Sequence, residues 1–259
     1  MDWLYALAGL IVGLMVGLTG VGGGSLMAPI LILFFGVSPS TAVGTDLWFA
    51  AITKSVGGFI HHRHGAPDWQ VVRRLALGSL PAAALTVWWL AKTDIHQIRG
   101  GTVMHILGGV LILTAIATMF KERIRTYATA ARTTAITVHP WQPALTVAAG
   151  ALLGCLVAVT SVGSGALGAA MLLTLYPFRL SARRLVGTDI VHAVPLTLVA
   201  GLGHLWMGTV DFGTLGMLLI GSIPGIALGS VLAGRLADNI VRPILAVILA
   251  FAGYRLLVA

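Results

Sequence analysis

The chain is predicted to be an all-α, polytopic integral membrane protein made of two tandem inverted repeats, and three observations predict this. Its 259 residues are 58% hydrophobic and only 9% charged, whereas about a quarter of the residues in a soluble domain are charged. Ten apolar segments, each long enough to cross or deeply enter a bilayer, follow one another along the chain. A glycine-rich turn followed by Gly-Thr-Asp occurs twice, ending at Asp46 and again at Asp189.

Five apolar segments are expected in the first half, each bounded by polar residues or glycines. The first ends at a run of glycines, and the second is short, so it either crosses the membrane or forms part of a re-entrant hairpin. The third follows Ser38 and Pro39, which mark a helix start because proline is tolerated in the first turn. The fourth and fifth are apolar runs of crossing length. The five segments cover residues 3–18, 26–35, 41–60, 75–90 and 103–120.

The second half repeats this pattern with the same number of segments in the same order. Its second segment is again short, and its third follows Ser181, another expected helix start. Its segments cover residues 144–159, 166–176, 185–206, 214–232 and 243–258. Residues 123–142 are polar and basic without a strong period, which indicates a linker. The predicted organisation is a first membrane repeat at 1–122, a cytoplasmic linker at 123–142 and a second membrane repeat at 143–259.

The distribution of basic residues predicts the orientation of the two repeats. Each half crosses an odd number of times if the glycine turns join two full crossings or form a re-entrant hairpin, and an even number if only one arm spans. Even parity divides the loop cations almost equally between the two faces. Odd parity places twelve on one face, namely Arg63, Arg73, Arg74, Lys121, Arg123, Arg125, Arg132, Arg179, Arg183, Arg184, Arg235 and Arg242, against Lys92, Arg99 and Arg255 on the other. The positive-inside rule therefore favours inverted repeats, with both termini outside and the linker in the cytoplasm.

Composition and motifs also exclude several kinds of protein. Although the net charge is +8, the arginines lie in short clusters between apolar runs, where they set topology and contact anionic lipid, so no nucleic-acid partner is expected. Cys155 is the only cysteine, which rules out a disulfide within the chain and metal sites built on thiolates. The N-terminus has no basic region before its apolar run, so no cleavable signal peptide is expected. No cofactor and no metal are expected.

Two acids, Asp46 and Asp189, are placed inside the membrane, where a carboxylate costs several kcal/mol unless it is paired, hydrated or protonated. Each lies about eight residues after its helix start, roughly 12 Å, which brings it toward the midplane of a core about 30 Å thick. Either each aspartate braces a neighbouring break in the backbone, or it carries a proton or lines the path of a substrate.

The two glycine turns are the expected anion site. A broken helix exposes unpaired backbone N–H groups, and a half-helix that starts near the midplane attracts an anion through its dipole. Close helix packing through small residues is the alternative explanation for any single glycine. The expected substrate-binding residues are Thr19, Gly22, Gly23, Gly24, Thr45, Asp46, Lys54, Ser161, Gly163, Gly165 and Thr188.

Two further side chains share helix faces with the buried acids. Lys54 lies eight residues after Asp46, so it can hold an anion or snorkel to the interface. His192 lies three residues after Asp189 and is either its proton partner or a buried, hydrogen-bonded histidine. We expect Asp189 and His192 to couple protons, because a carboxylate and an imidazole can share a proton near neutral pH.

The segments that carry these residues resemble the TauE/SafE sulfite exporter family, also called the TSUP family. They are residues 17–31 (GLTGVGGGSLMAPIL), 42–58 (AVGTDLWFAAITKSVGG) and 185–204 (LVGTDIVHAVPLTLVAGLGH), and the resemblance covers nearly the whole chain. It implies a carrier in the bacterial inner membrane for small sulfur-containing anions or organic acids, driven by the proton gradient. The second copy has SVGSG in place of GVGGG and no counterpart of Pro29, which leaves open whether both halves contribute equally to binding.

The first functional interpretation is a proton-coupled secondary transporter, expected to be an exporter, of a small anion such as sulfite, a sulfonate or another organosulfur anion. The chain has no GxxxxGK[ST] motif, so ATP-driven transport would need a partner. A passive anion channel is the second interpretation and a membrane enzyme or assembly factor the third, although no HExxH, opposed histidine pair or CxxC favours an enzyme. Expected partners are the anion, protons and membrane lipids, and a homo-oligomer is left open.

Overall fold

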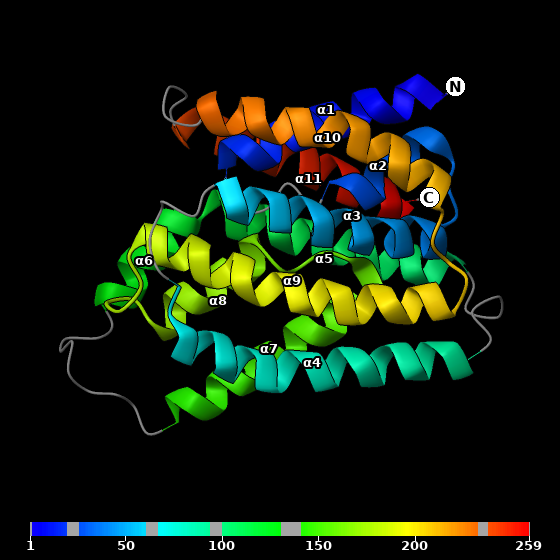
Figure 1. Ribbon diagram of the computed structural model, residues 1–259. Coiled ribbons are helices and arrows are strands. Elements are labelled where there is room, and N and C mark those ends of the chain that lie inside the picture. Colours follow the sequence, from blue (N-terminus) through cyan, green and yellow to red (C-terminus); the bar gives the residue numbers. More distant parts are fainter. Residues whose placement is uncertain are drawn as a thin grey trace.

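The computed structural model describes residues 2–19, 26–60, 67–93, 100–130, 141–232 and 238–258, and these form eleven α-helices and no strand (Figure 1). The predicted all-α fold class of a polytopic membrane protein is therefore confirmed. In the first half the helices are α1 (Asp2–Thr19), α2 (Met27–Phe35), α3 (Pro39–Ile60), α4 (Trp69–Lys92), α5 (Gly100–Met119) and α6 (Lys121–Ala130). In the second half they are α7 (Gln142–Thr160), α8 (Ala166–Leu175), α9 (Ala182–Trp206), α10 (Phe212–Leu232) and α11 (Asp238–Val258).

Helix length separates the elements that can cross a bilayer from those that cannot. The described residues contain five helices that are both long enough and apolar enough to cross, which are α4, α5, α7, α9 and α10. By contrast, α2 has 9 residues and α8 has 10, so each is about 15 Å long or less, half of a core about 30 Å thick. The two short segments expected from the sequence are thus half-helices.

Helix α6 was not predicted, because its ten residues are mostly polar and no apolar stripe marks a helical period. It continues from α5 through Phe120, whose N–H bonds to the carbonyl of Ile116 and whose carbonyl accepts from the N–H of Ile124. The first part of the polar linker is therefore helical. The remainder, at 131–140, lies outside the described residues.

Glycines hold two pairs of parallel helices in direct backbone contact. In α1, a Cβ added at Gly13 would lie 2.4 Å from the carbonyl oxygen of Ser222 in α10, and one at Gly225 would lie 2.5 Å from the carbonyl oxygen of Leu10. In the second pair, a Cβ at Gly150 of α7 would lie 2.3 Å from the carbonyl oxygen of Leu75 in α4. Small residues permit such close approach in membranes. The same interfaces include Gly9, Gly17, Gly221, Gly229, Gly78 and Gly154.

Helices α3 and α9 lie side by side in the middle of the molecule and run in opposite directions (Figure 1). The indole N–H of Trp48, early in α3, donates to the carbonyl of Gly201, late in α9, over 3.0 Å. Figure 1 shows the α1 and α10 pair on one side of these two helices and α4 on the other. The two helices that carry Gly-Thr-Asp therefore lie at the centre of the fold.

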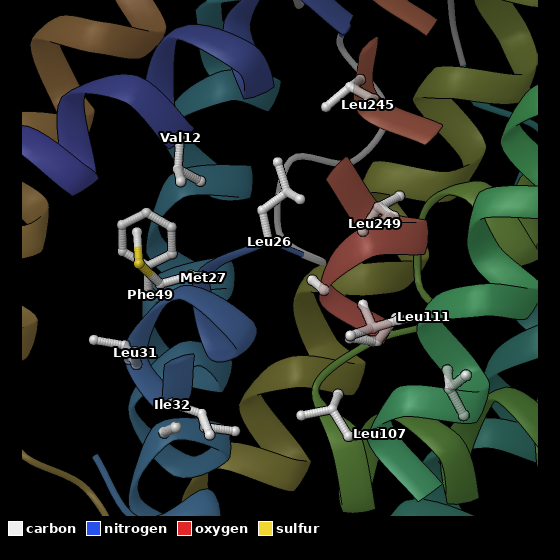
Figure 2. Close-up of a cluster of buried hydrophobic side chains, with 14 of the residues drawn as sticks. Val12, Leu26, Met27, Leu31, Ile32, Phe49, Leu107, Leu111, Leu245 and Leu249 are labelled. Atoms are coloured by element: carbon white, nitrogen blue, oxygen red, sulfur yellow. The ribbon is translucent and has the colours of Figure 1, made fainter. Parts of the chain in front are cut away.

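The largest apolar core packs half-helix α2 among its neighbours. Figure 2 shows Met27 and Leu31 of α2 near Val12 of α1 and Phe49 of α3, with Leu249 of α11 nearby, and all five are buried. This packing holds α2 in place although it is too short to span.

The chain termini and helix α6 lie at opposite ends of the molecule, and tryptophans are exposed on its surface. The N- and C-termini lie at one end and α6 lies at the other (Figure 1). Six tryptophans have exposed side chains, as expected for residues at membrane interfaces, and they are Trp3, Trp69, Trp88, Trp89, Trp141 and Trp206.

Candidate functional site

The second glycine turn breaks the chain between α7 and α8. Helix α7 ends at Thr160, Ser161 adopts a left-handed backbone with φ of 58°, and Gly163 and Gly165 have φ of 131° and 143°. Residues other than glycine rarely adopt these positive φ values. The SVGSG sequence thus forms the turn because its glycines reach a conformation that other residues avoid.

Helix α8 begins at this turn with an uncapped N-terminus. Gly165 precedes the helix without a side-chain hydrogen bond to it. The N–H of Gly168 bonds to the carbonyl of Gly163 over 3.0 Å, but the N–H groups of Ala166 and Leu167 have no partner among the described residues. Free N–H groups and the helix dipole make such an end attractive to an anion.

Lys54 of α3 reaches this turn from the other half of the chain. Its Nζ donates to the carbonyl oxygen and to the hydroxyl oxygen of Ser164, each over 2.8 Å. The side chain is only 6% exposed, so the ammonium lies inside the protein and does not snorkel to an interface. Ser164 was not among the expected binding residues, although it stands within the SVGSG motif.

Asp46 is fully buried near Ser161 of the second glycine turn and near the start of α2. Neither of its carboxylate oxygens makes a hydrogen bond with a described residue, and the hydroxyl of Ser161 is likewise unpaired there. Ser161, the backbone of Ala28 at the start of α2, and Lys54 are nevertheless close enough to act on this carboxyl group. The carboxyl group of Asp46 therefore lies near possible donors without a well-formed hydrogen bond to any described residue.

Asp189 occupies the corresponding place at the start of α8. A Cβ added at Gly168 would lie 2.9 Å from Oδ1 of Asp189, so the carboxylate rests against the first turn of that helix. Its other oxygen, Oδ2, is buried and has no hydrogen-bond partner in the described chain. Lys54 acts electrostatically on Asp189 as well as on Asp46. One ammonium thus acts on two buried carboxyl groups that come from different halves of the chain.

His192 has a neutral partner. Its Nε2 and the hydroxyl of Ser79 in α4 are 2.8 Å apart, and both side chains are buried. Among the described residues, no hydrogen bond joins His192 to Asp189. His204 bonds the carbonyl of Ala158 and the hydroxyl of Thr209, each over 2.9 Å, and thereby ties the end of α9 to α7.

The three predicted threonines use their hydroxyls within the protein. Thr19 donates to the carbonyl of Met15 over 2.8 Å. Thr45 accepts from the N–H of Asp211 over 3.1 Å, and Thr188 accepts from the N–H of Asp68 over 3.0 Å. The threonines of the two Gly-Thr-Asp elements therefore fix the loop that precedes a neighbouring helix.

The structure thus brings together a subset of the residues expected to form the site, and they are Asp46, Lys54, Ser161, Gly163, Gly165 and Asp189. Gly22, Gly23 and Gly24 lie outside the described residues. Ser79, Ser164 and Gly168 were missed, because their importance depends on contacts between helices that are far apart in sequence. No cluster of three or more histidine, cysteine or acidic side chains suited to a metal occurs in the described parts of the chain.

Comparison with known proteins gives consistent matches. The family model described as sulfite exporter TauE/SafE matches residues 5–256. The probable membrane transporter protein YjnA of Bacillus subtilis (strain 168) is 38% identical over 97% of this chain and 98% of its own length. The probable membrane transporter protein YdhB of the same organism is 26% identical over 98% of this chain and 99% of its own length. No solved structure matches the chain.

Proposed function

We propose that this chain, which belongs to the sulfite exporter TauE/SafE family, exports a small anion such as sulfite, a sulfonate or another organosulfur anion across the bacterial inner membrane, coupled to protons. It is a multi-pass membrane transporter and not an enzyme, as its family and relatives establish. The nature of the anion, the direction and the coupling are inferred from the family description and from the site.

The single observation that carries the proposal is the buried Lys54 ammonium beside the uncapped start of α8. An ammonium has three N–H donors, and Ser164 takes two of them. The third donor, with the N–H groups of Ala166 and Leu167, can bind the oxygens of a small anion. Ser161 offers a further hydroxyl that no described residue uses.

The balance of charge around Lys54 supports coupling to protons. With Asp46 and Asp189 both ionised, the site holds two negative charges and one positive, and the anion would add another negative charge. Such a charge excess is costly at membrane depth. Protonation of one aspartate lowers that excess by one charge, so binding of the anion and binding of a proton are expected to be linked at this site. Asp189 is our candidate for this step, with His192 held in place nearby by Ser79.

The burial of the charged groups favours a carrier over a channel. Asp46, Asp189 and Lys54 are exposed by only 0%, 2% and 6%. An open, water-filled pore would leave such groups hydrated. A closed site that must open to each side in turn is the arrangement expected of alternating access.

A thermal-shift screen of the purified protein tests the substrate class. Sulfite, sulfate, thiosulfate, sulfoacetate, taurine and short carboxylates serve as probes, since a ligand at one hundred times its Kd stabilises a protein by about 2.7 kcal/mol. We expect Lys54→Met to lose the shift and Lys54→Arg to retain part of it, because arginine keeps the charge but not the shape. Lys92→Met, which removes an exposed lysine stacked on Trp88, is the matched control and should behave as the native protein does.

Flux into proteoliposomes tests the mechanism. Accumulation of the bound anion against its gradient should collapse on addition of a protonophore. Equal thermal shifts in Lys54→Met and Lys92→Met would refute the binding site, and flux that only follows the anion's own gradient would favour a channel.

A further inference from the structure

A charged pair crosses between the two halves at the end of the molecule where α4 and α9 begin. Arg179, in the turn between α8 and α9, donates from Nε to Oδ2 of Asp68 over 2.6 Å and from Nη2 to Oδ1 over 2.9 Å. A two-point bond between a guanidinium and a carboxylate is stronger and better aligned than a single ionic contact. Asp68 stands immediately before α4 and also accepts from the N–H of Val71 over 3.3 Å.

This pair connects directly to the candidate site. The N–H of Asp68 donates to the hydroxyl of Thr188, which is the residue before Asp189. Exposure falls from 40% at Arg179 to 4% at Asp68, 0% at Thr188 and 2% at Asp189. The four residues therefore form a line from the surface to the buried carboxylate, and the ion pair is its outermost part.

Neighbouring contacts hold the arginine in this position. Nη2 of Arg179 also donates to Oε1 of Gln70 over 2.7 Å, and the guanidinium lies 5.8 Å from the centre of the Tyr176 ring. The Tyr176 hydroxyl accepts from Arg74 of α4 over 3.2 Å and lies 2.8 Å from the hydroxyl of Thr146 in α7. The pair thus closes a seam between α4 on one side and the α8–α9 turn on the other.

Near the other Gly-Thr-Asp element, the described residues contain no corresponding ion pair. There the N–H of Asp211 donates to Thr45, as the N–H of Asp68 donates to Thr188. Among the described residues, the donors to the Asp211 carboxylate all come from its own helix start, and they are the N–H groups of Gly213 and Thr214 and the Thr214 hydroxyl. No arginine or lysine pairs with Asp211 in the described structure. In the part of the chain that the structure describes, an ion pair therefore fastens the end at Asp68, and no ion pair fastens the end at Asp211.

We propose that Arg179 and Asp68 are positioning residues that latch this end of the transport path shut, and that the pair must separate each time the end opens to admit or release the substrate. The proposal rests on the chain being a transporter, whichever anion it carries. A static brace is the competing explanation, and it requires the pair to stay closed throughout the cycle.

Accessibility of a buried cysteine tests the latch without any substrate. Leu185 is 1% exposed, lies one turn before Thr188 and packs against α4 and α8, so Leu185→Cys in a Cys155→Ser background reports opening of this seam. Asp68→Asn leaves a good capping residue at the start of α4, because asparagine also accepts from backbone N–H groups. The substitution removes the ion pair with Arg179. We expect Asp68→Asn and Arg179→Gln each to raise the labelling rate about tenfold, and the double variant to match the single ones because the same pair is lost.

The conservative and matched variants make the result specific. Arg179→Lys keeps a charge without the two-point geometry and should give an intermediate rate. Asp211→Asn alters the equivalent cap of α10 and should leave labelling of Leu185→Cys at the parent rate. Equal rates in Asp68→Asn and Asp211→Asn would overturn the latch.

A covalent link distinguishes a moving latch from a static brace. The double variant Asp68→Cys/Arg179→Cys is made in the Cys155→Ser background. A short, reducible bis-methanethiosulfonate reagent then joins the two cysteines, so a covalent cross-link replaces the ion pair. Transport should fall to background on cross-linking and return on reduction, whereas native-like flux in the cross-linked protein would refute the proposal. Should no tested anion be carried, the labelling experiment still decides, so failure of the latch and failure of the proposed substrate class remain distinguishable.

Discussion

At the scale of the residue, Gly168 makes room for the carboxylate of Asp189. A Cβ at this position would lie 2.9 Å from Oδ1, closer than non-bonded atoms tolerate, so Gly168→Ala must displace the acid from the start of α8. We expect loss of anion binding with a drop in stability of about 1–3 kcal/mol, the usual cost of an overfilled site. The thermal-shift screen measures both effects. Gly109→Ala, where a Cβ would meet nothing within 4 Å, is the control, and equal binding by the two variants would contradict this role.

The two buried acids are expected to do different work. Asp46→Asn should weaken anion binding, because its carboxylate and Lys54 act on each other beside Ser161. Asp189→Asn should retain binding but lose the response of flux to a pH gradient. Thermal shifts and proteoliposome flux, compared between the two variants, measure the difference. The division of labour is wrong if both variants lose binding alike or if both keep proton-driven flux.

The latch itself should not respond to physiological pH. Burial alone would raise the pKa of Asp68, but hydrogen bonds from Arg179 and Val71 outweigh it and hold the pKa below its ordinary value of 3.8. Because the pKa is lowered in the closed state, the ionised Asp68 carboxylate stabilises that state at every pH above the ordinary pKa. This stabilisation is lost only as the pH falls through the lowered pKa. The ratio of Leu185→Cys labelling between Asp68→Asn and its parent should therefore stay constant from about pH 5 to 8. A ratio that fell toward one within this range would contradict the assignment.

Single residues show what sequence reasoning could and could not find. Asp46, Asp189 and Lys54 stood out because charges are rare in apolar segments, and they do meet beside the second glycine turn. The pairing of Arg179 with Asp68 had no such signal, because both residues lie at polar segment ends where charges are ordinary. The ion pair can be recognised only from the three-dimensional contact between the two halves of the chain.

At the scale of the element, helix length was readable from sequence and helix pairing was not. Apolar runs gave all ten expected segments, and the short second run of each half became half-helices α2 and α8. Glycine spacing in α1 and α10 is compatible with many partners, so the sequence could not say which helices would touch. Helix α6 was missed because a polar helix carries no apolar period.

Disrupting one glycine contact should loosen a helix pair. Gly13→Leu would push a side chain into the backbone of Ser222, where even a Cβ would lie 2.4 Å from the carbonyl oxygen. We expect a loss of at least about 1–3 kcal/mol in stability, measured as a lower melting temperature in detergent. Gly216→Leu adds the same bulk to α10 at a place where a Cβ meets nothing within 4 Å, and it should melt as the parent does. Similar melting of the two variants would show that α1 and α10 do not pack this tightly in the membrane.

At the scale of the whole molecule, the closest helix pairs join one half of the chain to the other. Helix α1 packs on α10 while α7 packs on α4, so in each pair the first helix of one half packs on the fourth apolar helix of the other half. Both termini lie at one end and α6 at the other (Figure 1), and the inverted orientation of the two halves stays a prediction.

Orientation can be measured by labelling single cysteines in intact cells after Cys155 is replaced. Arg125→Cys in the linker helix should react only when the inner face is opened, because the basic face is expected in the cytoplasm. Asp2→Cys, at the opposite end, should react from outside and serves as the paired control. Labelling of Arg125→Cys by an impermeant reagent in intact cells would end the proposed orientation.

The crossed pairing of the four glycine-bearing helices has a consequence for how this protein could have arisen and how it must be made. Residues 1–130 expressed alone would present the packing faces of α1 and α4 without α10 and α7, so neither half can complete its own structure. Two halves supplied as separate chains should find each other and restore a working carrier, whereas either one alone should be degraded. The linker then ensures that the two halves are made in equal numbers, as the fusion of two subunits into one chain would.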